Sequence, residues 1–358
     1  MKMLLLAIRA MGDVVLTTPI YRLLKNAYPM GTLDVVVERP YGDLLFGNPN
    51  LDAIYEVERS RKGPGFLRWP AHIKLIAALR RRRYDMVVDL FSGPRSAMMA
   101  RLTGARCRIG EDTRRRGRGF LYTHPVPVKR EEEHLVMQKL RLIRSLVGEV
   151  AEAPLELFIL PREREEAEML LRSAGARQAA LRVGLFPGAG WAHKRWPPEC
   201  FAALGDILAS ERAADIFLLG GERDVAACEA VAARMHHSPV LVCERRSLRA
   251  TAALISMMDL FVSNDTGPMH MAVALQVATV ALFGPSNIQK YAPWGNRFEV
   301  VSRYLPCSPC PQHQDTCHLV GRVRQECMLE ISVEEVLGAI ARLTPAATEM
   351  RWPAEKTS

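Results

Sequence analysis

The sequence predicts an α/β protein made of two consecutive doubly wound halves. Three observations support this expectation. Short apolar runs alternate with helical patterns, which favours parallel strands linked by helices. This alternation starts twice, near residue 3 and again near residue 182. The length of 358 residues suits about two domains, and a content of 49% hydrophobic and 24% charged residues is typical of a folded globular protein.

The first half begins with the apolar run Met3 to Ile8, which predicts a buried strand. The turn Arg9 to Asp13 follows, and a helical pattern then runs from Val14 to near Tyr28. Two more strands and three more helical stretches are expected before residue 150. They are Asp34 to Val37, Met86 to Leu90, Ile73 to Arg83, Arg95 to Leu102 and His134 to Val147.

Gly148 and the proline-bounded segment after it mark the domain boundary. We therefore expect an N-terminal domain over residues 1–150, a C-terminal domain over 151–345 and a polar tail over 346–358.

The second half repeats the scheme with five strands and at least three helices. The strands are Arg182 to Phe186, Ile216 to Leu219, Val240 to Val242, Leu260 to Val262 and Thr279 to Phe283. The helical windows are Glu199 to Ala209, Asp224 to Met235 and Leu248 to Met257. Ligands of doubly wound sheets bind beyond the carboxyl ends of the strands, so the loops after these runs are the expected place for chemistry.

The positive charge is concentrated in the first half. Residues 1–150 hold 27 Lys and Arg against 15 Asp and Glu, whereas the rest of the chain holds 21 against 24. Such asymmetry indicates an anionic partner, which is a nucleic acid, a membrane surface or a phosphorylated substrate.

The apolar run after Lys2 ends at Arg9 with no cleavage site behind it, so we expect a cytoplasmic protein. The stretch Thr266 to Gln289 contains no Asp, Glu, Lys or Arg and is long enough to cross a bilayer. The pairs Gly267-Pro268 and Gly284-Pro285 divide it, and we expect a buried helix followed by a buried strand instead.

The loop after the first strand carries Gly12 and Asp13. Glycine allows close backbone approach to a ligand, and a carboxylate at a strand-to-helix turn has the position of a general base. The structural alternative for Asp13 is an N-cap. The Gly-x-Gly-x-x-Gly fingerprint is absent, which argues against a nicotinamide enzyme.

The turn Pro187-Gly188-Ala189-Gly190, followed by Lys194 and Arg195, offers backbone N–H groups and cations to phosphate oxygens. Its structural alternative is a basic turn between a strand and a helix. The Gly-Lys-Ser/Thr order of a P-loop is absent.

A third loop, Asp265-Thr266-Gly267, lies at the expected start of the helix that carries His270. Unpaired N–H groups and the positive end of the helix dipole favour a pyrophosphate there. The structural alternatives are a capped helix start and a core histidine. Glu222, after another strand, has the position of a ribose contact or of a helix cap.

The chain resembles the ADP-heptose:lipopolysaccharide heptosyltransferases, glycosyltransferase family 9. The matching segments follow one another in order across nearly the whole chain: Ile8 to Pro19, Phe186 to Ala189, Lys194 to Pro197, Leu218 to Gly221 and Asn264 to His270. The resemblance implies a GT-B fold, in which two Rossmann-like domains with parallel sheets face each other across a cleft. The acceptor would bind the N-terminal domain and the nucleotide sugar the C-terminal one.

The resemblance also implies roles for single residues. Asp13 matches the catalytic base, and Lys194 a catalytic, phosphate-binding lysine. The donor site matches Gly12, Pro187, Gly188, Ala189, Lys194, Glu222, Asp265, Thr266, Gly267 and His270. The implied reaction is an inverting transfer of heptose from ADP-heptose to the lipopolysaccharide inner core, with no cofactor required for catalysis.

Arginines supply candidate contacts to an anionic acceptor. Arg9, Arg114, Arg115 and Arg116 are expected to bind phosphate or carboxylate groups of the lipopolysaccharide core. The run Arg80 to Arg83 is expected to face the core or the anionic inner-membrane surface, on which the protein would be peripheral. Exposed solvated runs are the structural alternative.

Eight cysteines are unevenly spaced, and four of them, Cys307, Cys310, Cys317 and Cys327, crowd one segment. They are enough for one tetrahedral structural zinc or iron site, with reduced thiols as the alternative. A disulfide framework is not expected in a reducing compartment.

Two other functions remain open at this point. A protein-directed heptosyltransferase of the same family would use the same donor motifs. A nucleic-acid-binding protein would use the arginine runs, but no interleaved aromatic side chains accompany them.

Overall fold

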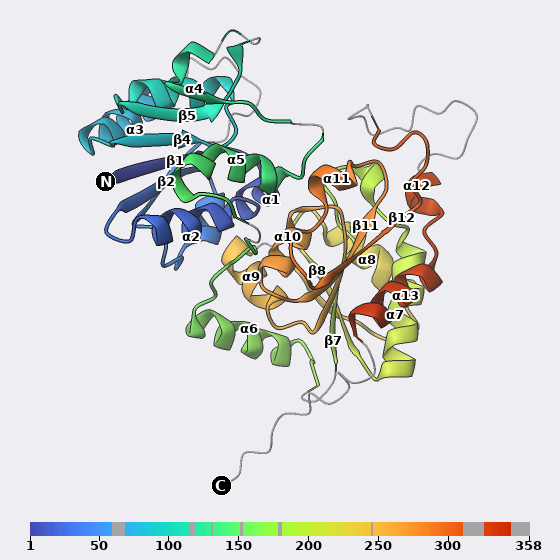
Figure 1. Cartoon of the computed structure of the whole chain (residues 1–358). Coiled ribbons are helices and arrows are strands. Elements are labelled where there is room, and N and C mark those ends of the chain that lie inside the picture. Colours follow the sequence, from blue (N-terminus) through green and yellow to red (C-terminus); the bar gives the residue numbers. More distant parts are fainter. Residues whose placement is uncertain are drawn as a thin grey trace. The chain divides into compact units, whose positions relative to one another are not determined.

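The computed structural model describes residues 1–58, 69–114, 117, 119–129, 132–150, 153–177, 181–244, 246–310 and 326–344, and of residues 69–72 only the backbone. The chain forms two compact units, Met1–Phe158 and Ile159–Ser358 (Figure 1). Each unit is built on its own six-stranded parallel sheet. The α/β class predicted from the sequence is confirmed.

The sheet of the first unit has the strand order β3-β2-β1-β4-β5-β6. Its strands are β1 (Lys2–Ala7), β2 (Thr32–Glu38), β3 (Ala53–Val57), β4 (Met86–Asp89), β5 (Cys107–Glu111) and β6 (His124–Val126). The side chains of Met3–Ala7 are fully buried because β1 lies in the middle of the sheet with helices on both faces.

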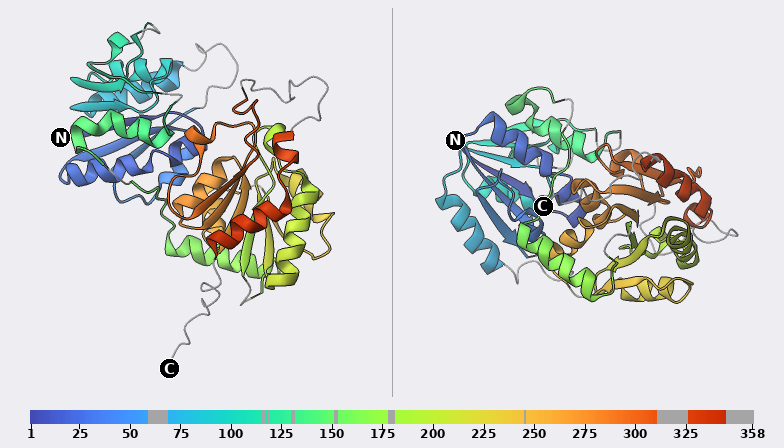
Figure 2. Two further views of the ribbon diagram at one scale, coloured as in Figure 1. Left: turned by 45° about the vertical axis from the view of Figure 1, so that its right-hand side comes forward. Right: turned by 90° about the horizontal axis from the view of Figure 1, so that it is seen from below.

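In the described part of this unit, the α-helices beside the sheet are α1 (Met11–Val15), α2 (Thr18–Ala27), α3 (Trp69–Arg81), α4 (Pro94–Leu102) and α5 (Leu135–Val147). Short 3-10 helices occur at Tyr41–Leu45 and Gly119–Leu121. Helices α2 and α5 contact each other, as do α3 and α4, and the two pairs cover opposite faces of the sheet (Figure 2).

The single helix expected from Val14 to Tyr28 is wrong, because α1 and α2 are separate. Pro19 has no N–H to donate to the carbonyl of Val15, which would be its helical partner. The hydroxyl of Thr18 donates to that carbonyl instead, at 2.8 Å. The sequence signal for this break was the proline itself.

The sheet of the second unit has the order β12-β11-β10-β7-β8-β9. Its strands are β7 (Arg182–Phe186), β8 (Asp215–Gly220), β9 (Val240–Cys243), β10 (Leu260–Asn264), β11 (Ala278–Phe283) and β12 (Phe298–Ser302). Its helices are α6 (Pro161–Ser173), α7 (Pro198–Arg212), α8 (Val225–Ala232), α9 (Leu248–Ile255), α10 (Gly267–Ala274), α11 (Ile288–Tyr291), α12 (Glu326–Leu329) and α13 (Val333–Leu343), with a 3-10 turn at Ala192–Lys194.

The two sheets share one topology. In each, the chain first builds outward from the central strand on one side and then crosses to build on the other. The order reverses between β1 and β4 in the first unit and between β7 and β10 in the second. Ligands of doubly wound sheets bind at such switch points, beyond the carboxyl ends of the strands.

The uncharged stretch Thr266 to Gln289 forms the buried helix α10 and the buried strand β11, as predicted. Among the residues described, no helix combines the length and the apolar character needed to cross a bilayer.

The strands that sequence analysis missed are β3, β5, β6 and β12, most of them outer strands. Their side chains are largely only partly buried, so they lack the continuous apolar run of the central strands. Strand β6 also contains Pro125, which a sheet edge tolerates.

Candidate active site

Asp13 lies in α1, directly beyond the carboxyl end of β1. Ala10 occupies the N-cap position of this helix, so capping does not account for Asp13. The Asp13 side chain is 18% exposed, and its Oδ2 lies 3.5 Å from Arg9 Nε. Gly12 precedes it in the same helical turn. The structure thus places an accessible carboxylate at the switch point of the first sheet.

Arg9 is held from a second side by Phe91, which follows β4. The Arg9 guanidinium lies 5.9 Å from the centre of the Phe91 ring, and Lys139 Nζ lies 4.4 Å from it. Lys139 is buried and pairs with Glu111 at 3.1 Å. Through these two cations, the Phe91 ring joins the loop after β4 to the loop after β1 and to helix α5.

The loop after β4 is fixed by the fully buried carboxylate of Asp89. Asp89 Oδ1 accepts the N–H groups of Phe91 and Ser92 at 3.2 and 2.9 Å, and Oδ2 accepts the Tyr122 hydroxyl at 2.8 Å. Burial raises the pKa of Asp89, and these hydrogen bonds oppose the shift. The Phe91 ring thereby gains a rigid support.

The two basic runs lie at opposite ends of the parallel strands of the first sheet. Arg80 to Arg83 close α3 and precede β4, so they lie where the strands begin. Arg114 follows β5, at the edge that carries Asp13, and its guanidinium is bound to the carboxylate of Asp112. Arg115 and Arg116 lie outside the described residues. Only Arg9 and Arg114 of the expected acceptor contacts are therefore located, both beyond strand carboxyl ends.

In the second unit, Lys194 and Asp265 form an ion pair at the switch point. Lys194 Nζ lies 2.6 Å from Asp265 Oδ2, with the two side chains 23% and 9% exposed. Lys194 comes from the loop after β7 and Asp265 from the loop after β10. Two of the predicted donor loops therefore meet, as expected.

Asn264, to which the sequence analysis gave no role, organises the loop after β7. Its amide Nδ2 donates to the carbonyls of Pro187 and Gly188 at 3.0 and 3.2 Å. Its Oδ1 accepts the backbone N–H of Trp196 at 3.0 Å. Arg195 adds a bond from Nη2 to the carbonyl of Ala189 at 3.2 Å. The buried amide of Asn264 thus holds both ends of the turn that carries Lys194 by hydrogen bonds.

The start of α10 adjoins this ion pair. Thr266 is its N-cap residue and Gly267 its first residue, with Pro268 next. The first N–H groups of a helix have no helical acceptor and lie at the positive end of its dipole, which suits an anion. His270 lies one turn further along and is only 4% exposed, as expected for a core histidine.

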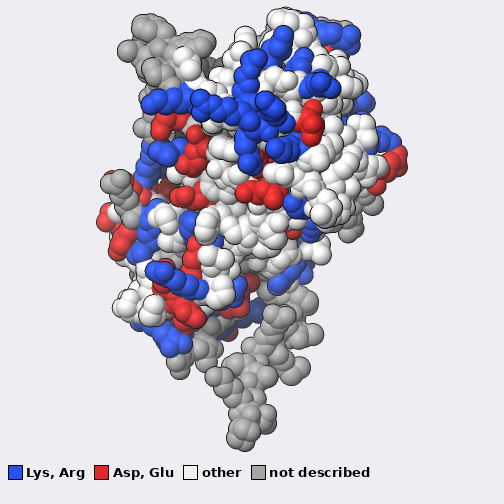
Figure 3. All heavy atoms as spheres, turned by 90° about the vertical axis from the view of Figure 1, so that its left-hand side faces the viewer, with Lys and Arg blue, Asp and Glu red and all other residues white. Residues whose placement is uncertain are grey.

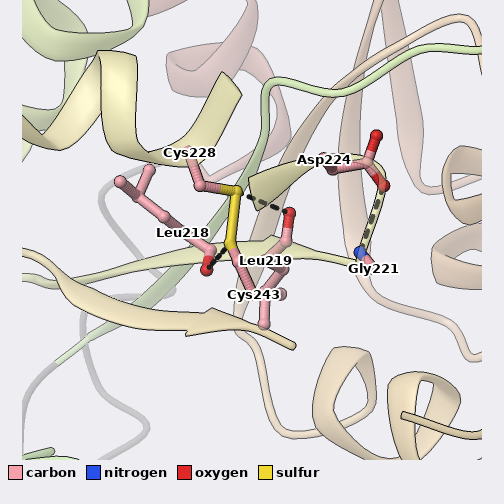
Figure 4. Close-up of a disulfide and its surroundings, with 6 residues drawn as sticks. All are labelled: Leu218, Leu219, Gly221, Asp224, Cys228 and Cys243. Atoms are coloured by element: carbon pink, nitrogen blue, oxygen red, sulfur yellow. Dashed lines mark hydrogen bonds between the residues drawn. A yellow bond between two sulfur atoms is a disulfide. The ribbon is translucent and has the colours of Figure 1, made fainter. Parts of the chain in front are cut away.

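Asp224, rather than Glu222, is directed at these loops. Asp224 Oδ2 accepts the N–H of Gly221 at 3.1 Å (Figure 4). Its other oxygen covers Gly188, where a Cβ atom would lie only 2.1 Å away. Burial raises the pKa of Asp224. The hydrogen bond from the Gly221 N–H and the charge of Arg195 oppose this shift. Glu222 is exposed. The sequence signal that was missed is Asp224 itself, a second carboxylate two residues after Glu222.

A disulfide joins Cys228 of α8 to Cys243, the last residue of β9 (Figure 4). It lies against Gly220, where a Cβ would be 3.1 Å from Cys228 Sγ and 3.4 Å from Cys243 Sγ. The expectation of no disulfide is wrong for this pair. The strand register brings the two cysteines together. Gly220 of β8 pairs with Cys243 of β9, and α8, which carries Cys228, packs over the same strand ends.

The expected metal site finds no support. Within the described part of the chain, no group of three or more His, Cys, Asp or Glu side chains is arranged to hold a metal. Cys307, Cys310 and Cys327 belong to that part and do not form such a group. Cys317 lies outside it.

Comparison with known proteins agrees with this geometry. The family model described as glycosyltransferase family 9 (heptosyltransferase) matches residues 72–320. The chain belongs to this family and is therefore a glycosyltransferase, as the sequence motifs predicted. Lipopolysaccharide heptosyltransferase 3 of Escherichia coli is 27% identical over 344 residues, which cover 94% of this chain and 97% of the relative.

Solved structures show the same fold. A family 9 glycosyltransferase of Veillonella parvula superposes with a TM-score of 0.81 at 23% identity, covering 96% of both chains. The ADP-heptose lipopolysaccharide heptosyltransferase II of E. coli gives 0.75 at 22% identity, covering 96% of this chain and 98% of that one.

Proposed function

We propose that this glycosyltransferase transfers heptose from ADP-heptose to a hydroxyl group of the lipopolysaccharide inner core, with inversion at the anomeric carbon. Membership of the heptosyltransferase family and the names of its relatives support the donor and the acceptor. The observation that carries the proposal is the Lys194–Asp265 ion pair beside the start of α10.

The donor diphosphate would bind at this ion pair. The Lys194 ammonium has three N–H groups, of which one is directed at Asp265 Oδ2. The others, with the N–H groups at Thr266 and Gly267, would neutralise the charge that develops on the leaving ADP. The lack of a side chain at Gly188 leaves room for the Asp224 carboxylate beside this loop.

Asp13 would act as the general base. Its carboxylate would take the proton of the acceptor hydroxyl while that oxygen forms a bond to the anomeric carbon of heptose. The bond from the anomeric carbon to the β-phosphate oxygen breaks, and ADP leaves with the electron pair. Arg9, fixed between Asp13 and Phe91 and 60% exposed, would bind an anionic group of the acceptor.

Asp224 would hold the nucleotide ribose in place of Glu222. It is partly buried and already joins the Gly188 and Gly221 loops, whereas the Glu222 side chain is exposed. A carboxylate can accept hydrogen bonds from both ribose hydroxyls.

The anionic inner-membrane surface would bind the first unit at the amino ends of its strands. Arg80, Arg81, Arg83, Arg101 and Arg106 are exposed there, and none makes an ion pair with a described residue. Figure 3 shows Lys and Arg gathered on this side of the molecule, the side of Figure 1 that carries α3 and the N-terminus. Such clusters attract acidic phospholipids.

The function is tested with ADP-heptose and a panel of truncated core acceptors, read by mass spectrometry. We expect a mass gain of one heptose on one acceptor and none on a polypeptide panel. Asp13→Asn should lower turnover at least about 100-fold, because the acceptor hydroxyl loses its base. The variant should keep the thermal shift caused by ADP. Near-normal turnover of Asp13→Asn, or transfer to polypeptides alone, contradicts the proposal.

The ribose assignment is tested by calorimetric titration of ADP. Asp224→Asn should weaken ADP binding about tenfold, the effect of losing a hydrogen bond to a charged group. Glu222→Gln is the matched control and should stay within about twofold. Because burial raises the pKa of Asp224, the ADP affinity of the wild type should begin to fall on acidification above pH 3.9, the usual aspartate value, and the Asn variant should lack this pH dependence. Equal effects of the two substitutions would reject Asp224.

The membrane assignment is tested by sedimentation with phosphatidylglycerol and phosphatidylcholine vesicles. The triple variant Arg80→Glu/Arg81→Glu/Arg83→Glu should bind phosphatidylglycerol at least about tenfold more weakly than wild type. The control Arg164→Glu/Arg234→Glu/Arg297→Glu changes three exposed arginines of the second unit and should bind normally. Salt should weaken wild-type binding. Equal loss in both variants, or tighter binding to DNA or RNA than to vesicles, would overturn it.

A further inference from the structure

Ser286, from the loop after β11, shares the oxygen of Asp265 that binds Lys194. The Ser286 hydroxyl donates to Asp265 Oδ2, the same atom that lies 2.6 Å from Lys194 Nζ. Strands β7, β10 and β11 are neighbours in the sheet, so three adjacent strand ends converge on one carboxylate. Neither the motifs nor the reaction scheme uses this serine.

The loop that carries Ser286 is anchored independently of Asp265. The Ser308 hydroxyl donates to the carbonyl of Gly284 at 2.8 Å, and the Cys310 N–H donates to that of Pro285 at 2.7 Å. On the other side, the side chain of Asn287 caps α11 by accepting the N–H of Lys290 at 3.1 Å. The hydroxyl of Ser286 is therefore presented by a braced segment.

Two donors on one oxygen constrain how the carboxylate can turn. Rotation of the Asp265 carboxyl group would exchange its two oxygens and move the ammonium of Lys194 with it. A hydroxyl that binds Oδ2 from a second direction opposes this rotation. The Ser286 hydroxyl also satisfies part of the hydrogen-bonding capacity of Oδ2. The remaining N–H groups of the Lys194 ammonium are therefore left for a further anion.

We propose that Ser286 is a positioning residue for the donor diphosphate, acting through Asp265 on Lys194. The inference rests on the proposed function, because it takes the diphosphate to be the ligand of Lys194. Ser286 itself need not touch the donor. Its hydroxyl holds Asp265 Oδ2 so that the Lys194 ammonium is directed at the phosphates before they bind, which lowers the cost of ordering that side chain.

The test compares ADP with adenosine by calorimetry, since adenosine lacks the phosphates. Ser286→Ala should weaken ADP binding about tenfold and leave adenosine binding within about twofold. Ser286→Thr keeps the hydroxyl and should restore most of the ADP affinity. Ser210→Ala is the matched control, because its hydroxyl bonds the carbonyls of Asp206 and Ile207 within α7, away from the Ser286 loop, and its ADP affinity should stay near wild type. Thermal unfolding confirms that each variant is folded.

A double-mutant cycle identifies the route of the effect. In a Lys194→Met background, Ser286→Ala should cause no further loss of ADP affinity, because the side chain it positions is absent. Additive losses, equal losses for ADP and adenosine, or equal effects of the Ser286 and Ser210 substitutions would overturn the inference. If wild type itself bound ADP no better than adenosine, the proposed donor site would be wrong, and the two failures are thus distinguishable.

Discussion

The proposed donor site depends on the ion pair between Lys194 and Asp265. A carboxylate that is only 9% exposed would repel a diphosphate placed beside it. The ammonium at 2.6 Å cancels that charge and keeps N–H groups for a second anion. The dipole of α10 adds positive potential at the same strand ends. The proposed diphosphate site is thus built around an acidic residue.

Topology explains why these groups meet. Both units place the reversal of strand order beside their first strand, and the candidate residues follow the two strands that flank it. In the first unit these loops carry Asp13 and Phe91; in the second they carry Lys194 and Asp265. One folding scheme, used twice, thus places the proposed base Asp13 in the first unit and the proposed phosphate-binding Lys194 in the second.

The sequence predicted the central strands and the loops after them, because continuous apolar runs with turn residues behind them are local signals. The break before α2 was missed although its signal, Pro19, is local; the Thr18 hydroxyl replaces the helical bond that Pro19 cannot make. The roles of Asn264 and Ser286 could not be predicted, because each bonds to a distant segment. The Cys228–Cys243 bond likewise depends on strand register, which spacing alone does not reveal.

Determination of a crystal structure of this chain with bound ADP tests the central claim most directly. We expect the β-phosphate within hydrogen-bonding distance of Lys194 Nζ and of the backbone N–H groups at the start of α10, with Asp265 still bound to the lysine. ADP bound away from the carboxyl ends of β7 and β10, or phosphates directed away from Lys194, would contradict the account.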